Sequence, residues 1–325
     1  MSNVIRVGIL GMGNVGRIHH FVASQMDNFE VVCVADPQMD SVPVEHVFDD
    51  YRDLLRECSH DLDAVINALP TAFHLGSVED TVRYGLPMLL EKPMGIDSGE
   101  AEQIQNIAEE YCVKVMVGMT GRYHPEFMFA HKFLSEIGEI MHVDERIHFG
   151  SANFPQQYVT RELFGHGVGL TNGVHTIDRF LWFTGQPITS MRIDHVGNEL
   201  LHGDVEDSLR GKVTFRDGVP GWFSLRYSPH TESDYVFEIV GTEGMIRVKG
   251  FDNAVLIQGD TVTELYEHNP DMGFDQRHFP GIEAELNTFA TFLQGNERTK
   301  HVDDCIRAQR VIDVFYKNGP NFSRS

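Results

Sequence analysis

The sequence predicts a two-domain protein: an α/β N-terminal domain with a doubly wound parallel sheet, then an α+β domain with a large mixed or antiparallel open sheet. Its 325 residues are enough for two domains that each bury a core. Short apolar runs alternate with helical patterns in the first part of the chain, as in parallel sheets. Later runs are separated by turn signals such as Asp217–Gly218, which favours hairpins. We therefore expect domains at 1–122 and 123–325, with the final helix able to pack back on the first.

Residues 4–10 form the first apolar run, typical of a strand buried on both faces. The turn GMGNVG follows at once, then the helix-compatible stretch RIHHFVASQM. A second apolar run, EVVCVAD, ends at Asp36, which lies 20 residues after Gly16. Strand, glycine-rich turn, helix, strand and acid in this order predict a Rossmann dinucleotide-binding unit. A tight turn without a ligand is the alternative.

Each residue of the turn has a physical task. Gly11 permits the tight turn, Gly13 lets the backbone approach a pyrophosphate, and Gly16 lets the helix pack against the strand. The helix N-terminus, which begins at Asn14 and Val15 of the motif, offers N–H groups and a positive dipole end to phosphates. These residues are therefore candidates for cofactor binding.

Asp36 indicates which cofactor is preferred. Its carboxylate can accept both hydroxyls of an adenosine ribose and would repel a 2′-phosphate. We therefore expect NAD, with NADP less favoured.

Further strands are predicted at residues 62–70 and 86–91, each followed by residues at its C-terminal end. Ligands of doubly wound sheets bind beyond these ends. Lys92 lies at such an end, and Pro93 restricts its backbone. The residues of these ends expected to contact the cofactor are Ala68, Leu69, Pro70, His74, Glu91 and Lys92.

The second half carries several strand patterns and two closing helices, at 283–295 and 302–319. Ahead of these two helices, residues 169–185 (GLTNGVHTIDRFLWFTG) have the apolar spacing of a helix. Thr171, His175 and Asp178 are four and three residues apart, so on one helix they share a side. Residues 151–169 lack periodicity and are either a loop over a site or an irregular connection.

Composition excludes several classes of partner. The net charge is −22, which disfavours nucleic acid and anionic membranes. We find no transmembrane run and no secretory signal, and the four cysteines are scattered, so we expect a cytoplasmic protein. No H-x-x-x-H pair with a nearby carboxylate stands out, so no metal site is expected.

Taken together, GMGNVG, NALPTAFH, EKPMG, GRYHPEF and NGVHTIDRF resemble the Gfo/Idh/MocA oxidoreductases, the glucose–fructose oxidoreductase and inositol dehydrogenase group. The resemblance runs from about residue 4 to the last helix. It implies an NAD(P) domain and an open sheet face that forms a homodimer or homotetramer. It also implies catalytic roles for Lys92, in a Lys–Pro peptide often found cis, and for His175. Arg122 and Tyr123 fall where members often line the active site.

One position departs from the family pattern. Many members carry Asp four residues before the histidine, where this chain has Thr171. A carboxylate there would orient the imidazole; here threonine can hydrogen-bond, or Asp178 can orient the ring.

The function expected from these features is hydride transfer between NAD(P) and a secondary alcohol of a sugar, inositol or related polyol. Two alternatives share the fold: an NAD-dependent glycoside hydrolase and a non-catalytic dinucleotide-sensing regulator.

Overall fold

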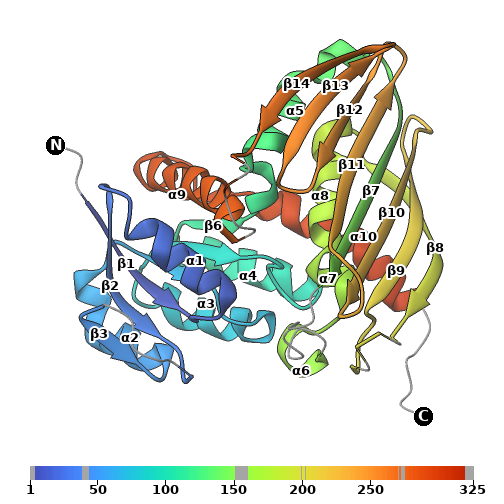
Figure 1. Ribbon diagram of the computed structural model, residues 1–325. Helices are drawn as coiled ribbons and strands as arrows, with labels where there is room; N and C mark the ends of the chain where they lie inside the picture. Colours follow the sequence, from blue (N-terminus) through green and yellow to red (C-terminus); the bar gives the residue numbers. More distant parts are fainter. Residues whose placement is uncertain are drawn as a thin grey trace. The chain divides into compact units, whose positions relative to one another are not determined.

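The computed structural model describes residues 4–38, 44–150, 160–198, 200–201, 203–269, 271 and 275–318 (Figure 1). Contacts divide the chain into two compact units. The first contains Met1–Thr120 with Ile282–Ile306, and the second contains Gly121–Gly281 with Arg307–Ser325. The sequence predicted a single boundary after residue 122. In the structure, the first unit also contains residues 282–306.

A seven-stranded parallel sheet forms the centre of the first unit, in the order β15-β6-β5-β4-β1-β2-β3. Its strands are β1 Ile5–Leu10, β2 Phe29–Ala35, β3 His46–Phe48, β4 Ala64–Asn67, β5 Met88–Glu91, β6 Val115–Gly118 and β15 Thr299–Lys300. Every residue of β4, β5 and β6 is buried, which explains their continuous apolar runs. The predicted Rossmann-type sheet is confirmed.

Two helices of this unit, α2 and α4, begin at an aspartate that caps the first turn. The Asp50 carboxylate accepts from Arg52 N at 2.8 Å at the start of α2, and Asp97 accepts from Glu100 N at 2.8 Å at the start of α4. The helices are α1 Asn14–Ala23, α2 Tyr51–Cys58, η1 Ser59–Asp61, η2 Thr71–Phe73, α3 His74–Val82, α4 Ser98–Glu110, η3 Thr120–Arg122 and α9 Phe279–Gln294, of which η3 and α9 extend across the division between the units. The Lys114 ammonium donates to the carbonyls of Phe292, Leu293 and Gly295, which holds the end of α9 in the first unit.

The second unit is built on an eight-stranded sheet in the order β14-β13-β12-β11-β7-β10-β9-β8. Its strands are β7 Ile140–Gly150, β8 Ile188–Gly197, β9 Ser208–Phe215, β10 Pro220–Ser228, β11 Asp234–Gly241, β12 Met245–Lys249, β13 Asn253–Gln258 and β14 Thr261–Glu267. Neighbouring strands are antiparallel, except that β7 and β10 are parallel. The large mixed sheet is thus as predicted.

Helices cover one face of this sheet, where α5 contacts β12 to β14, α7 contacts β9 and β10, and α8 contacts β7 and β10 (Figure 1). Residues such as Val143, Leu209 and Phe223 are buried on that face, and their strand neighbours point to the other, which we call the open face. The helices are α5 Pro125–Lys132, η4 Leu134–Ile137, α6 Arg161–Phe164, α7 Val168–Thr171, α8 Gly173–Thr184, η6 Asp275–His278 and α10 Val302–Asn318, whose first turns belong to the first unit.

One helix prediction was wrong. The segment expected to carry Thr171 and His175 on a single helix is divided at Asn172 into α7 and α8. Of the predicted loop 151–169, residues 151–159 lie outside the described part, and the rest contains α6 and the start of α7.

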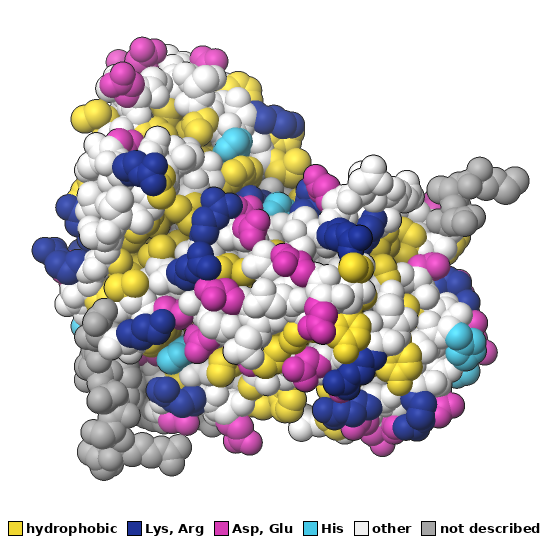
Figure 2. Space-filling view, turned by 180° about the vertical axis from the view of Figure 1, so that it is seen from behind, with side chains coloured by type: hydrophobic (Ala, Val, Ile, Leu, Met, Phe, Trp, Pro, Cys, Tyr) yellow, Lys and Arg dark blue, Asp and Glu magenta, His cyan; other side chains and the backbone are white. Residues whose placement is uncertain are grey.

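The surface carries mixed charge. Figure 2 shows acidic and basic side chains interspersed on the face that it draws, in keeping with acidity spread along the chain. Among the described residues, no helix combines the length and the apolar character needed to span a bilayer.

Candidate functional site

The glycine-rich turn after β1 has the close packing that the sequence predicts. Gly11 has φ +86°, and a Cβ there would lie 2.7 Å from the Ala68 carbonyl oxygen. A Cβ on Gly16 would lie 2.0 Å from the Gly11 oxygen, so only glycine fits at either position. A Cβ on Gly13 would meet nothing within 4 Å, which leaves space in front of the first turn of α1. This is the space that a pyrophosphate needs.

Asn14 and Val15 form the first residues of α1, and Val15 is 36% exposed. Gly13 is the N-cap of this helix and has no side chain to accept from its first N–H groups, which a bound anion could therefore engage.

Asp36 follows β2 and is held by two backbone N–H groups. Its Oδ2 accepts from Met12 N at 2.8 Å, and its Oδ1 accepts from Gln38 N at 2.8 Å. Since each carboxylate oxygen has two lone pairs, both can still accept a ribose hydroxyl. The carboxylate is therefore fixed beside the glycine turn in the orientation that the motif requires.

The residues after β4 form a second wall of this site. Ala68 N donates to the Leu10 carbonyl at 2.8 Å, and Leu69 N donates to Asn67 Oδ1 at 3.3 Å. Pro70 then begins the 3₁₀ turn η2. Asn67, buried and bonded to Ser77 Oγ at 2.7 Å, fixes this turn and was not identified from the sequence.

His74 is 1% exposed, and its ring links two strand ends. Its Nε2 lies 2.8 Å from the Leu69 carbonyl oxygen, and its Nδ1 lies 3.0 Å from that of Pro93. The ring thus holds the segment after β4 against the segment after β5. This geometry gives His74 a positioning role beside the residues expected to touch the cofactor.

Lys92 directly follows β5, and its peptide bond to Pro93 is cis, as the family resemblance implies. Its backbone N donates to Glu91 Oε2 at 3.2 Å. The other oxygen of Glu91 lies 2.7 Å from Nε2 of His19, which is fully buried on α1. Gly118, opposite Glu91 on β6, leaves room for this carboxylate.

Glu285 of α9 completes a buried cluster with His19 and Glu91. Burial alone would raise the pKa of Glu91, but the hydrogen bond and charge of His19 lower it. Burial raises the pKa of Glu285 well above its usual range, and the charge of Glu91 adds to this effect. Thr120 Oγ1 donates to Glu285 at 3.0 Å. The two pKa shifts have opposite directions, so Glu285 is the carboxyl of the pair that favours the protonated form.

The ligand atoms of these three residues lie within 4.8 Å of one another, and His and Glu are residue types that bind metal ions. A metal ion would have to displace the proton of Glu285. The expectation that the chain holds no metal stays a prediction.

In the second unit, His175 lies in the first turn of α8 beside Gly121. A Cβ on Gly121 would be 3.4 Å from His175 Nδ1 and 2.8 Å from Arg179 Nη1. Arg179, 2% exposed, donates to Glu145 at 2.6 Å and to the Tyr235 hydroxyl at 3.0 Å. Arg179 was not singled out from the sequence, although its position one turn after the histidine places both on one helix face.

The other predicted orienting residues have defined partners. Thr171 is buried at the end of α7, and its hydroxyl lies 3.0 Å from the Gly167 carbonyl oxygen and 2.7 Å from the Tyr227 hydroxyl. Both Asp178 oxygens accept from Arg122, at 2.8 and 2.6 Å.

These contacts bear on the roles predicted for Arg122 and Asp178. The Arg122–Asp178 pair is a buried bidentate ion pair that ties η3 to α8, and it engages the carboxylate expected to orient the histidine. Tyr123, beside this pair, is 9% exposed.

The first unit fits a dinucleotide on these observations, since Gly13 leaves open space at a helix N-terminus and Asp36 is fixed with free lone pairs. Residues 5–119 match the oxidoreductase family described as having an NAD-binding Rossmann fold, and residues 134–247 match the GFO/IDH/MocA C-terminal domain.

Among curated relatives, the rhizopine catabolism protein MocA of Rhizobium meliloti is 27% identical over 76% of this chain and 78% of that protein. An inositol 2-dehydrogenase of Rhizobium meliloti is 27% identical over 58% of this chain and 57% of that enzyme. A structure of scyllo-inositol dehydrogenase from Lactobacillus casei, with NAD(H) and scyllo-inositol, has a TM-score of 0.77 at 21% identity and covers 98% of both chains. Both domains match in order, so the chain belongs to the Gfo/Idh/MocA family of NAD-binding oxidoreductases.

Proposed function

We propose that this protein is a dehydrogenase that oxidises a secondary alcohol of a sugar, inositol or related polyol and prefers NAD to NADP. The observation that carries the proposal is the position of Lys92. It follows β5 at the end of the sheet where doubly wound proteins bind ligands, with its backbone held by Glu91 and followed by Pro93. The names of the relatives, which include inositol 2-dehydrogenases, support the substrate class.

The cofactor, when bound, accepts the hydride from the substrate carbon. The part of Lys92 is to donate a hydrogen bond to the substrate oxygen and to stabilise the negative charge that develops there. A fixed donor of this kind typically lowers the barrier by roughly 2.7–4 kcal/mol. The bond from Lys92 N to Glu91 and the contact of His74 with Pro93 hold this segment, so less of that energy is lost to ordering.

His175 is proposed to take the hydroxyl proton of the same substrate. Imidazole suits this task because its unperturbed pKa, about 6.5, is close to neutral pH. Nε2 is proposed as the proton acceptor, because Nδ1 lies on the side of the ring that faces Gly121.

Asp36 is proposed to set the cofactor preference. Its carboxylate, held by Met12 N and Gln38 N, would lie beside the adenosine ribose. A 2′-phosphate would bring like charges together, which disfavours NADP.

The experiment is a screen of sugars and inositols with NAD or NADP, followed by absorbance at 340 nm. With an active substrate, Lys92→Met should lower kcat about 100- to 1,000-fold while NAD affinity stays the same. The control is Lys317→Met, because that side chain is 75% exposed on α10. Unchanged turnover of the Lys92 variant would refute its catalytic role.

The same assay separates the alternatives. Release of an aglycone from a glycoside without net NADH would indicate the hydrolase. Binding of NAD without turnover of any alcohol, together with functional insensitivity to Lys92 and His175 substitutions, would indicate a sensing regulator.

A further inference from the structure

His74 joins two strand ends of the cofactor site, and both of its ring nitrogens face backbone carbonyl oxygens. Its Nε2 lies 2.8 Å from the oxygen of Leu69, and its Nδ1 lies 3.0 Å from that of Pro93 and 3.3 Å from that of Met94. The side chain is buried, so bulk water does not replace these partners. All four residues belong to the first unit.

The rules of hydrogen bonding limit what this ring can satisfy. A carbonyl oxygen only accepts, and a neutral imidazole donates through one nitrogen while the other carries a lone pair. A neutral His74 therefore makes one of its two links and points a lone pair at the other oxygen. The imidazolium is the form that donates to the segments after β4 and β5 at the same time.

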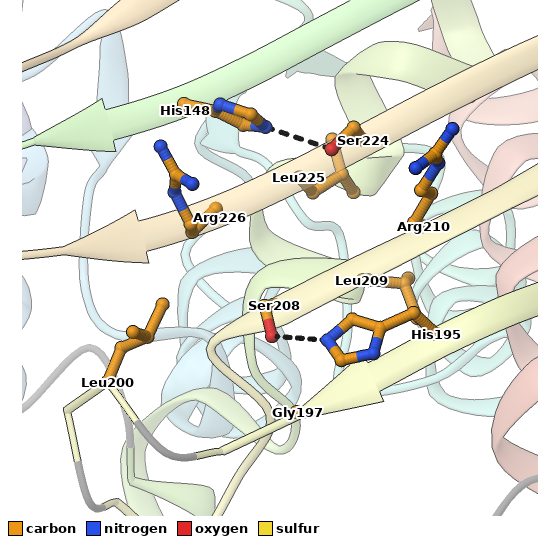
Figure 3. Close-up of a pocket in the computed structure, with 10 residues that line it drawn as sticks. All are labelled: His148, His195, Gly197, Leu200, Ser208, Leu209, Arg210, Ser224, Leu225 and Arg226. Carbon is orange, nitrogen blue, oxygen red and sulfur yellow. Dashed lines mark hydrogen bonds between the residues drawn. The ribbon is translucent and has the colours of Figure 1, made fainter. Parts of the chain in front are cut away.

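Two histidines of the second unit show how a neutral ring can be satisfied (Figure 3). His148 Nε2 lies 2.9 Å from Ser224 Oγ, and His195 Nε2 lies 3.3 Å from Ser208 Oγ, as the dashed lines mark. A hydroxyl can donate or accept, so it suits either state of a ring nitrogen. A carbonyl oxygen cannot adapt in this way, which distinguishes His74 from these two histidines.

The surroundings of the His74 ring act on its proton in opposite directions. Burial lowers the pKa of His74, whereas the bonds to carbonyl oxygens and the negative charge of Glu91 on β5 oppose this effect. His19 of α1 binds one oxygen of Glu91. The polar side chains of the turn itself do not titrate: Ser77 Oγ donates to the His74 carbonyl at 3.0 Å and accepts from Asn67 at 2.7 Å. At neutral pH the neutral ring is therefore favoured, and anything that stabilises both links also favours uptake of a proton.

A bound dinucleotide would stabilise both links, because His74 connects two parts of its site. Leu69 belongs to the wall beside the glycine turn, where a Cβ on Gly11 would lie 2.9 Å from Leu69 N. Pro93 follows Lys92, the residue proposed to contact the substrate. A ligand that touches both parts binds more tightly when they are fixed relative to each other.

We propose that His74 is a positioning residue that takes up a proton when NAD binds, and that its imidazolium then holds the two parts of the cofactor site together. The pKa of His74 is then higher in the complex than in the free protein. The contribution of this proton to NAD affinity is complete below the pKa of the free protein and is lost as the pH rises through the pKa of the complex. This inference rests on the NAD site of the proposed function and not on turnover of a substrate.

The test is calorimetric titration of the full chain with NAD near pH 7, in phosphate and in Tris buffer. These buffers differ in their heat of ionisation, so the difference in measured heat gives the number of protons taken up per NAD. His74→Gln keeps an amide donor but cannot be protonated. The wild type should take up more protons than this variant, by as much as one per NAD. The variant should bind NAD roughly three- to tenfold more weakly near pH 5.5, and this difference should shrink as the pH rises toward 8.5.

His60→Gln is the matched control, because His60 is 73% exposed on η1 of the same unit and should leave proton uptake and NAD affinity unchanged. Nitrogen-15 spectra of the wild type with labelled histidine give a direct readout: in the NAD complex, the His74 ring should show two protonated nitrogens.

Three results would overturn the inference: equal proton uptake by wild type and His74→Gln, an affinity ratio that does not change with pH, or a neutral His74 ring in the complex. If the wild type binds no NAD, the proposed function is overturned as well. NAD binding without the proton difference would overturn this inference alone.

Discussion

Replacing Glu285 with glutamine tests whether the buried cluster of the first unit holds one carboxyl in its protonated form. Glu285 is fully buried on α9 and accepts a hydrogen bond from Thr120. Glutamine has nearly the same shape, keeps an oxygen that can accept that bond, and has no charge at any pH. The substitution therefore removes the titration of this group and leaves the packing almost unchanged.

The sign of the effect follows from the raised pKa of Glu285, caused first by burial and then by the charge of Glu91. The folded protein keeps the proton at pH values where the unfolded chain has lost it. The stability that this proton supplies is complete below the ordinary pKa of glutamate and is lost as the pH rises toward the folded pKa. Each pH unit in that window lowers the free energy of unfolding by about 1.4 kcal/mol. For a unit of this size, each kcal/mol corresponds to about 2–4 °C in Tm.

The assay compares melting temperatures of wild type and Glu285→Gln from pH 4.5 to 8.5. The two melting temperatures should agree near pH 4.5. As the pH rises, the variant should become progressively more stable than the wild type. Glu283→Gln is the control, because Glu283 is exposed on the same helix and should give a curve parallel to wild type. Parallel curves for Glu285→Gln and wild type would show that the carboxyl titrates normally, and the assignment of a protonated Glu285 would be refuted.

Three other predictions concern packing, ion pairing and cofactor choice. Gly16→Ala should destabilise the fold by about 1–3 kcal/mol, because the added methyl group overpacks the turn. Gly13→Ala, whose methyl group would meet open space, should keep the melting temperature of the wild type and lose NAD affinity. Equal changes in melting temperature for the two variants would contradict this prediction. Arg122→Ala should cost about 3–5 kcal/mol in chemical denaturation because it leaves buried Asp178 unpaired, and replacing both residues with apolar ones should cost less. Asp36→Ala should narrow the ratio of kcat/KM for NAD over NADP, and a wild-type enzyme that uses both equally would refute the role of this carboxylate.

Local pattern was sufficient for the parts of the fold that depend on short-range physics. Gly11 has a positive φ, and a Cβ on Gly16 would meet the Gly11 oxygen five residues earlier, so the spacing within GMGNVG already carries these two constraints. The parallel sheet follows from nearly continuous apolar runs, such as the first three residues of β4 and of β5, which suit a strand covered on both faces. The C-terminal end of a strand can also be recognised in the sequence, so the position of Lys92 directly after β5 could be predicted.

Contacts between side chains far apart in the sequence could not be predicted in the same way. His19 and Glu91 are 72 residues apart, and a histidine in a helix pattern gives no sign that it will meet a buried acid. The prediction for Thr171 and His175 was wrong in another way: helical spacing continues through Asn172, but α7 ends at Thr171 and α8 begins at Gly173.

The buried cluster explains why an acid comes before the lysine in the EKP motif. A buried charge is costly, but His19, which binds one oxygen of Glu91, and the Lys92 backbone N–H, which binds the other, both lower the pKa of this carboxyl. The cost of burying the carboxylate is thus offset by a contact that holds the strand end from which Lys92 projects. Gly118 contributes by leaving space for the acid, and protonated Glu285 contributes by adding no second charge. In this motif, the acid therefore anchors the end of β5 directly before Lys92, and the proline limits the backbone after it.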